Sequence, residues 1–245
     1  MKKKILALCL VVVLAVTAVT GATLAYFTDT DEETNTFTVG GINIELIEKN
    51  EDGTEFTQDQ ELMPGEENAI VKDVTVKNIS TKNDAYLWAE IWIPTALDAG
   101  ETNAKDNNLH WNNFNTYKDE NDNLVMCRMA EAEAKGYTLV AETMSKYLGE
   151  VDGYTGYRLW INNDVAHAPN GETYSLLYRV FMDKRVEQCT DENCTNSDEC
   201  LVLVNGTHYD GDWEIIVNAF GIQKDGFTTI DQAIAAYDGE GAGKP

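Results

Sequence analysis

The sequence predicts an all-β protein: an antiparallel β-sandwich of jelly-roll type, with long loops and one or two short helices. Apolar residues alternate with polar ones in about six segments, which is typical of half-buried strands. Helical spacing is confined to one internal segment and one short segment near the C-terminus. Many strands with few helices favour a sandwich over a parallel α/β fold.

The first strand is predicted on both sides of a glycine pair. Before the glycines, Phe37 and Val39 share one face of an extended chain. After them, Ile42, Ile44 and Leu46 share one face, with the parity switched. A bulge or bend at the glycines would direct both sets toward one core.

Two strands follow, and the second alternates on both faces. The segment 71–78 places Val74 and Val76 on one face. The segment AYLWAEIWI (85–93) carries two apolar sets, Leu87, Ala89, Ile91 and Ile93 on one face and Tyr86, Trp88 and Trp92 on the other. We therefore expect both faces of this strand to be covered.

The middle of the chain loses this alternation. Residues 94–126 are rich in Asn, Asp and Glu, which predicts a surface excursion. Residues 129–148 form the one extended helical candidate, because Val140, Met144 and Tyr147 are at helical spacing. Together these segments make residues 94–150 a loop and helix excursion from the sandwich.

Strands resume in the last third of the chain. The segment 173–182 alternates through Tyr174, Leu176, Tyr178, Val180 and Met182. A short C-terminal helix is predicted to begin at a threonine followed by a glutamine three residues later (229 and 232), the spacing of a capping box.

The N-terminus is typical of a secretory signal. Three lysines precede an uncharged apolar run, and small residues favour cleavage between Ala25 and Tyr26. The uncharged run is long enough to span a bilayer, so an uncleaved anchor is the alternative. The predicted organisation is a signal peptide (1–25), an acidic leader and candidate donor strand (26–41), a sandwich domain (42–238) and a flexible tail (239–245).

Charge and cysteine content restrict the function further. A formal net charge of −24 repels phosphate backbones, so we expect no nucleic-acid partner. Four cysteines follow the signal, Cys127, Cys189, Cys194 and Cys200, and in an oxidising compartment they permit two disulfides with three connectivities. The spacing within CTDENCTNSDEC differs from that of common zinc motifs, which favours a disulfide-pinned acidic loop at 189–200 with Cys127 joining one of its cysteines.

No catalytic or cofactor motif is present in the sequence. His110, His167 and His208 are dispersed, without the H-E-x-x-H spacing of zinc peptidases, so zinc is disfavoured and no metal site is predicted. The oxygen-rich segments 28–35 and 119–123 permit weak calcium binding but lack the spacing of an EF-hand loop. No nucleophile elbow or phosphate loop is present, so we expect no enzyme.

Several segments resemble the TasA and camelysin-like proteins of Gram-positive bacteria. The N-terminal stretch GATLAYFTDTDEETNTFTVGGINIEL is similar to their signature, and LMPGE, VKNISTKNDAYLWAEI, APNGETYSLLYRV and VNAFGIQKDGFTTIDQAIAAY resemble later family segments. The resemblance covers most of the exported domain, whereas the cysteine loop looks like a local addition.

The resemblance implies a secreted jelly-roll subunit of extracellular or cell-surface fibres in the biofilm matrix, processed by an ER-type signal peptidase similar to SipW. In such fibres the N-terminal segment joins the sheet of a neighbouring subunit. Open sheet edges accept an added strand in this way. The corresponding self-assembly residues here are Phe27, Phe37, Val39, Ile42, Ile44 and Leu46.

Three alternatives remain open at this stage. Residues 27–39 could fold back onto their own sheet instead of being donated. The camelysin label implies a zinc-dependent surface endopeptidase, which ranks second because the zincin motif is missing. A monomeric surface adhesin or glycan binder would use Trp88, Trp92, Trp160 and Tyr178 for stacking. Matrix or cell-wall components are expected partners, and contact with a membrane is expected only through an uncleaved signal.

Overall fold

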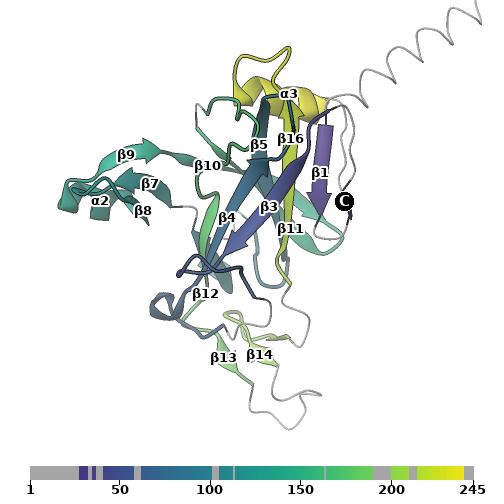
Figure 1. Ribbon diagram of the computed structural model, residues 1–245. Coiled ribbons are helices and arrows are strands. Elements are labelled where there is room, and N and C mark those ends of the chain that lie inside the picture. The colour runs from purple at the N-terminus through teal and green to yellow at the C-terminus, as the bar shows by residue number, and fades with distance from the viewer. Residues whose placement is uncertain are drawn as a thin grey trace, which may run out of the picture.

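Two antiparallel sheets packed face to face form the body of the protein (Figure 1). The computed structural model describes residues 28–32, 35–36, 41–57, 62–100, 105–112, 114–162, 164–189, 200–209 and 214–239. Strands predominate over helices, and the predicted antiparallel β-sandwich is confirmed. Among the described residues, no helix is long and apolar enough to cross a membrane.

The larger sheet has six strands in the order β10-β11-β5-β16-β1-β2. Their bounds are Thr28–Glu32 (β1), Asn35–Thr36 (β2), Ala85–Pro94 (β5), Thr143–Val151 (β10), Tyr154–Ile161 (β11) and Ile216–Gln223 (β16). The smaller sheet has the order β3-β4-β12-β6. Its strands are Ile44–Lys49 (β3), Ile70–Asn78 (β4), Leu109–Asn112 (β6) and Leu177–Met182 (β12), with a 3-10 turn at Glu66–Asn68 (η1).

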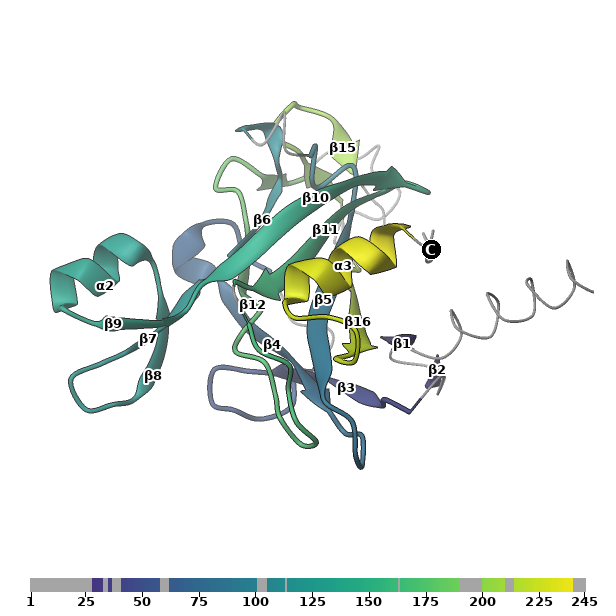
Figure 2. The same ribbon diagram turned by 90° about the horizontal axis from the view of Figure 1, so that it is seen from above.

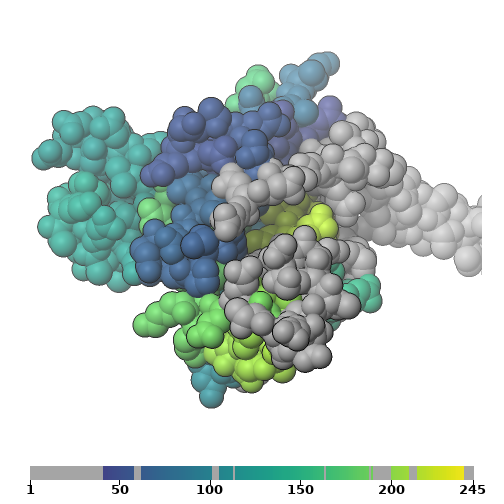
Figure 3. Space-filling model, turned by 90° about the horizontal axis from the view of Figure 1, so that it is seen from below, coloured from purple at the N-terminus to yellow at the C-terminus, as the bar shows by residue number. Residues whose placement is uncertain are grey.

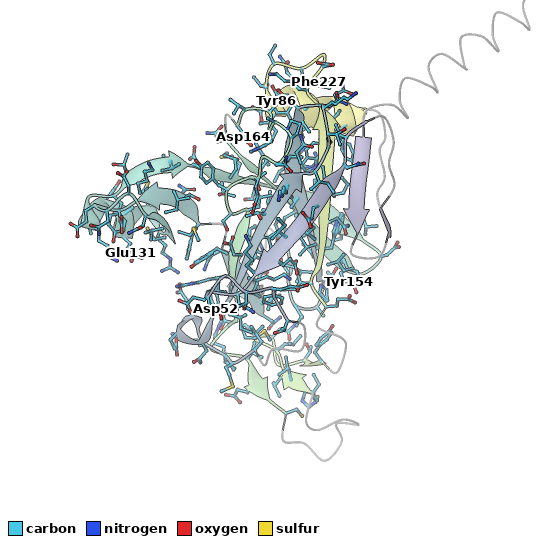
Figure 4. All side chains as sticks on the ribbon, viewed as in Figure 1. Asp52, Tyr86, Glu131, Tyr154, Asp164 and Phe227 are labelled. Carbon is cyan, nitrogen blue, oxygen red and sulfur yellow. The ribbon has the colours of Figure 1, made fainter. Side chains whose placement is uncertain are left out.

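Two three-stranded sheets lie outside the sandwich. One consists of Glu187–Gln188 (β13), Leu201–Val202 (β14) and His208–Tyr209 (β15). The other consists of Asn115–Lys118 (β7), Leu124–Cys127 (β8) and Thr138–Ala141 (β9), joined by helix α2 (Met129–Lys135). This second group forms a lobe at one side of the molecule (Figures 2 and 3), where Glu131 lies (Figure 4).

Strand β5 confirms the two-faced alternation of its sequence. One face, Leu87, Ala89, Ile91 and Ile93, is fully buried between the two sheets. The opposite face is covered by helix α3 (Ile230–Gly239), which packs on Tyr86 and Trp88 and on neighbouring apolar residues of β16. Tyr86 and Phe227 accordingly lie at the α3 end of the molecule (Figure 4).

The N-terminus of α3 has the predicted threonine and glutamine, with one difference. The Gln232 backbone N–H donates to Thr229 Oγ1 at 3.3 Å, as in a capping box. The Gln232 side chain accepts from the N–H of Thr228 at 3.0 Å rather than from Thr229. The helix therefore begins where the sequence predicts.

The prediction of a long helix over residues 129–148 is wrong beyond its first seven residues. Helix α2 ends at Lys135, because Gly136 adopts a left-handed conformation (φ 69°) and its N–H bonds back to the last turn. The following residues form β9 and β10, and β10 pairs with β11 over its whole length. Pairing with a distant strand thus outweighs the local helical spacing.

Two further predictions need correction. Residues 94–150 are not only an excursion, because β6 completes the smaller sheet and buries Leu109. The alternation predicted for 173–182 holds for Leu176, Val180 and Met182, which are buried, but Tyr174 is exposed and Leu177 is buried as well. The pairing of β12 with β4 also shifts in register between Leu177 and Arg179, where β4 has one residue more than β12.

Candidate functional site

The β16 edge of the larger sheet is the place where the N-terminal strand meets the sandwich. On one side β16 pairs with β5 from Ile216↔Trp92 to Gln223↔Ala85. On the other side β1 pairs antiparallel with it, from Thr28↔Ile222 to Asp31↔Ala219 (Figure 1). The strand expected for donation therefore pairs with its own sheet, as the fold-back alternative requires.

Strand β1 carries the acidic sequence TDTDE and is followed by the two-residue strand β2. Without β1, β16 would present a row of unpaired backbone N–H and C=O groups, which favours the addition of a strand. The edge thus has an acceptor strand and a strand able to fill it.

The chain is fastened to the sandwich immediately after this leader. Gly41 has φ 91°, a conformation that suits glycine, and its carbonyl accepts from Asn83 Nδ2 at 2.7 Å. The next polar contact is from the Asn43 N–H to Ser80 Oγ at 2.7 Å. The sandwich therefore holds the chain from Gly41 onward.

Three of the residues predicted for self-assembly belong instead to the core of their own chain. Ile42 and Ile44 are buried, and Leu46 packs against the same core. Gly221 lets them approach closely, since a Cβ there would lie 2.9 Å from Ile44 Cγ2. These three therefore anchor β3 and are not a contact surface for a second subunit. Phe27, Phe37, Val39 and the Ala25–Tyr26 junction lie outside the described residues.

The cysteines fall into two separate places, contrary to the expectation that Cys127 joins the loop. Cys127 is a buried free thiol in the lobe beside Tyr117 and Ala132, where burial raises its pKa. Cys189 and Cys200 lie together in the small sheet, with Cys189 N–H donating to the Cys200 carbonyl at 2.8 Å. Cys189 is disulfide-bonded, and Cys194 lies outside the described residues.

Among the residues that the structure describes, His208 is the histidine that contacts a cysteine. Its Nδ1 lies 3.8 Å from Cys189 Sγ, and Cys189, Cys200 and His208 offer ligand atoms within 4.8 Å of one another. The other two histidines contact aspartates: His110 Nε2 is 3.0 Å from Asp183 Oδ2, and His167 Nε2 is 2.7 Å from Asp164 Oδ2. The approach of His208 to the cysteines was not predicted, because seven residues and a turn separate it from Cys200 in the sequence.

The structure does not support a tryptophan face for glycan stacking. Trp88 and Trp92 are buried, and Trp160 is half-buried against the cluster beneath α3. The Trp88 ring packs against Phe220 and Tyr237, with centroids 5.9 and 5.3 Å away. These tryptophans serve packing, so the glycan-binding prediction loses its surface.

The acidic segment 119–123 serves a turn between β7 and β8. Asp119 Oδ1 accepts the N–H groups of Asn121 and Asn123, both at 2.8 Å. These hydrogen bonds lower the pKa of Asp119, with the Asn123 side chain as the main cause. Its carboxylate therefore closes the hairpin, and no other acidic group of the described residues joins it in a metal cluster.

Comparison with known proteins places the chain in a family. No curated protein and no solved structure matches it. One family does, and its match spans more than half of the chain, including β1, β3, β4 and β5. The chain belongs to the camelysin metallo-endopeptidase family of secreted surface proteins, whose sequence model matches residues 1–144.

Proposed function

We propose that the protein is a structural subunit of extracellular or cell-surface fibres in a biofilm matrix, assembled by donation of the N-terminal strand. One observation carries the proposal: β1 pairs with β16 and forms, with the two-residue strand β2, the last part of the larger sheet, and it precedes the point at Gly41 where the chain is fastened to the sandwich. In a monomer β1 covers its own β16 edge. In a fibre the same edge would receive β1 of a neighbour.

The energetics permit such an exchange. A donated strand in the same register makes the same backbone hydrogen bonds as the original one, so little is lost between the two states. The contact is heterologous, since one subunit offers a strand and the next an edge, and such contacts grow into filaments when they do not close. The concentration of subunits then determines how far assembly proceeds.

Processing is part of the proposal. A signal peptidase of the SipW type would cleave between Ala25 and Tyr26 and release the leader for exchange. The product would be secreted and would join the matrix or the cell surface, with matrix or cell-wall components as further partners. Removal of the three lysines of the signal changes the formal net charge from −24 to −27, and this charge keeps single subunits soluble before assembly.

The family's descriptive name refers to a metallo-endopeptidase, and the described residues of the matched region 1–144 do not fit such a site. His110 is the only histidine among residues 1–144, and it contacts Asp183. Within the described part of 1–144, no three histidine, cysteine or acidic side chains gather as metal ligands would. A peptidase is therefore not proposed.

Electron microscopy of two chains tests the fibre proposal. Residues 26–245 should form filaments on concentration, and a chain beginning at Ile42, which lacks β1, should remain monomeric. Circular dichroism and a thermal melt verify that the shorter chain is folded. Filaments should persist in EDTA, and neither chain should cleave casein. Monomers from both folded chains at high concentration and across pH would reject the proposal.

A further inference from the structure

A second site lies in the small sheet β13-β14-β15, at the opposite end of the molecule from α3 (Figure 1). Two buried cysteines and one histidine meet there. We propose that, in the reduced protein, Cys189, Cys200 and His208 bind a zinc ion that fastens this sheet. The site lies beyond residues 1–144, so it is not a metal site that the family match covers.

The distances suit a tetrahedral zinc ion. Zinc binds thiolate sulfur at about 2.3 Å and histidine nitrogen at about 2.0–2.1 Å, so two ligand atoms on one ion lie roughly 3.5–3.8 Å apart. Cys189 Sγ and His208 Nδ1 are 3.8 Å apart, and all three ligand atoms lie within 4.8 Å of one another. A small inward movement would bring the three onto one ion.

The backbone brings the three ligands together. β13 and β14 pair through Gln188↔Leu201, which places Cys189 beside Cys200. The chain then turns back, with Leu203 N–H donating to the Thr207 carbonyl at 2.8 Å, and β15 pairs with β14 through Val202↔His208. The hairpin thus carries His208 to the cysteines.

The strands of this sheet are short, with two residues each. Val186, Leu201 and Leu203 belong to the main core, and Val204 and Tyr209 pack against it. A metal ion bound by residues of three adjacent segments would add cross-links within the sheet, as structural zinc does in small domains.

The cysteine count also favours a metal. Cys127 is a free thiol in the separate lobe, so residues 189–200 contribute an odd number of cysteines. Disulfides within this segment cannot use all of them.

The disulfide at Cys189 and a zinc thiolate at the same sulfur exclude each other, so zinc binds only the reduced form. Water would complete the coordination.

Zinc binding to the reduced mature chain tests the proposal. The chain is purified with a phosphine reductant, supplied with zinc, dialysed and analysed by mass spectrometry for metal. We expect about one zinc per chain. The zinc affinity of Cys189→Ser, Cys200→Ser and His208→Ala should be weaker than that of the unaltered chain by about tenfold or more. Cys127→Ser is the matched control, because its thiol lies in the lobe, and it should bind zinc as the unaltered chain does.

Two further measurements keep the test independent of misfolded variants. Cobalt substituted for zinc in the unaltered chain should give thiolate-to-cobalt charge-transfer absorption, which requires cysteine ligands. Zinc should also raise the melting temperature of the unaltered chain and of Cys127→Ser, and leave that of His208→Ala unchanged. The proposal is overturned if the reduced unaltered chain holds no zinc, or if Cys200→Ser and His208→Ala bind zinc as tightly as it does.

Discussion

Arg158 and Glu90 face each other across β11 and β5, and the guanidinium donates through Nε and Nη2 to Glu90 Oε1 at 2.9 and 2.7 Å. Both residues are buried on the face that α3 covers. Through Nη1 the same guanidinium donates to Asp238 of α3 at 2.7 Å, and it lies 5.3 Å from the centre of the Tyr237 ring. One arginine therefore joins the helix to the sheet.

Replacing this arginine should destabilise the protein strongly. In Arg158→Met the free energy of unfolding should fall by about 3–5 kcal/mol, because Glu90 stays buried without its charge partner. Lys146→Met is the control, since Lys146 pairs with the same Asp238 at 3.1 Å from an exposed position and should cost less than about 1 kcal/mol. Urea unfolding followed by tryptophan fluorescence measures both. Equal losses would contradict this role for Arg158.

The deficit of Arg158→Met should also depend on pH. Burial raises the pKa of Glu90 above its ordinary value of 4.5, and the charge and hydrogen bonds of Arg158 oppose that rise. Without Arg158 the pKa rises further, so the folded variant holds a proton more tightly than the unfolded chain. That stabilisation is lost as pH increases from 4.5 through the raised pKa. The deficit should therefore be smaller near pH 5 than near pH 8, and a pH-independent deficit would refute the argument.

The alternation of apolar residues predicts the sandwich strands well where both faces are covered. The two faces of β5 are clear in the sequence because each packs against a different layer, the smaller sheet on one side and α3 on the other. β10 escapes prediction because its stability comes from β11, a partner that local spacing does not reveal. Its residues Met144 and Tyr147 therefore suggest a helix.

The candidate sites show the same limit. The sequence indicates an N-terminal strand, but the choice of β16 as its partner depends on how distant strands are ordered in the sheet. His208 reaches Cys189 only through the turn at 203–207, and no short motif encodes that approach. A hairpin that returns a histidine toward two cysteines becomes visible only in three dimensions.

A close approach at Gly156 gives a second stability prediction. A Cβ at Gly156 would lie 2.5 Å from Trp92 Cζ3, so Gly156→Ala must displace a buried ring. Overpacking of this kind costs about 1–3 kcal/mol. Gly239→Ala is the control, because nothing lies within 4 Å of a Cβ added there. Thermal melts should show a lower melting temperature for Gly156→Ala alone, and a neutral result would mean that Trp92 has room to move.

The Asp183 carboxylate should stabilise the fold near neutral pH and should lose this contribution in acid. Hydrogen bonds from Arg185 are the main cause that holds the pKa of Asp183 below its ordinary value of 3.8, and His110 adds another. A lowered pKa contributes stability that is present above 3.8 and is lost as pH falls below it. Asp183→Asn should cost about 1–2 kcal/mol near pH 6 and much less near pH 2.

Urea titrations at the two pH values measure the difference between Asp183→Asn and the unaltered chain. Asp122→Asn is the control, because Asp122 is almost fully exposed and pairs only with Lys118 in a surface contact. The same loss at both pH values would show that the Asp183 charge is unimportant and that the variant acts through packing.

The register of β1 on β16 allows a direct test of strand exchange. Asp31 and Ala219 are paired across the two strands, and directly opposite residues have Cβ atoms about 4.5–5.5 Å apart, close enough for a disulfide after a small adjustment. In the double variant Asp31→Cys with Ala219→Cys, oxidation of the monomer should lock β1 onto its own sheet. The locked chain should form no filaments, and a reducing agent should restore them.

Mixing the two single variants separates exchange from mere release of the strand. Chains with Asp31→Cys and chains with Ala219→Cys should become cross-linked to each other only if β1 of one chain enters the β16 edge of the next. Ser145→Cys, exposed on β10 at the far edge of the same sheet, replaces Ala219→Cys in the control mixture and should not be cross-linked. All mixtures keep the native cysteines, which could form cross-links of their own. The result is therefore the difference in cross-linked dimer between the test mixture and the control mixture. Filaments from the locked chain, or equal cross-linking to Ser145→Cys, would mean that subunits associate through another surface.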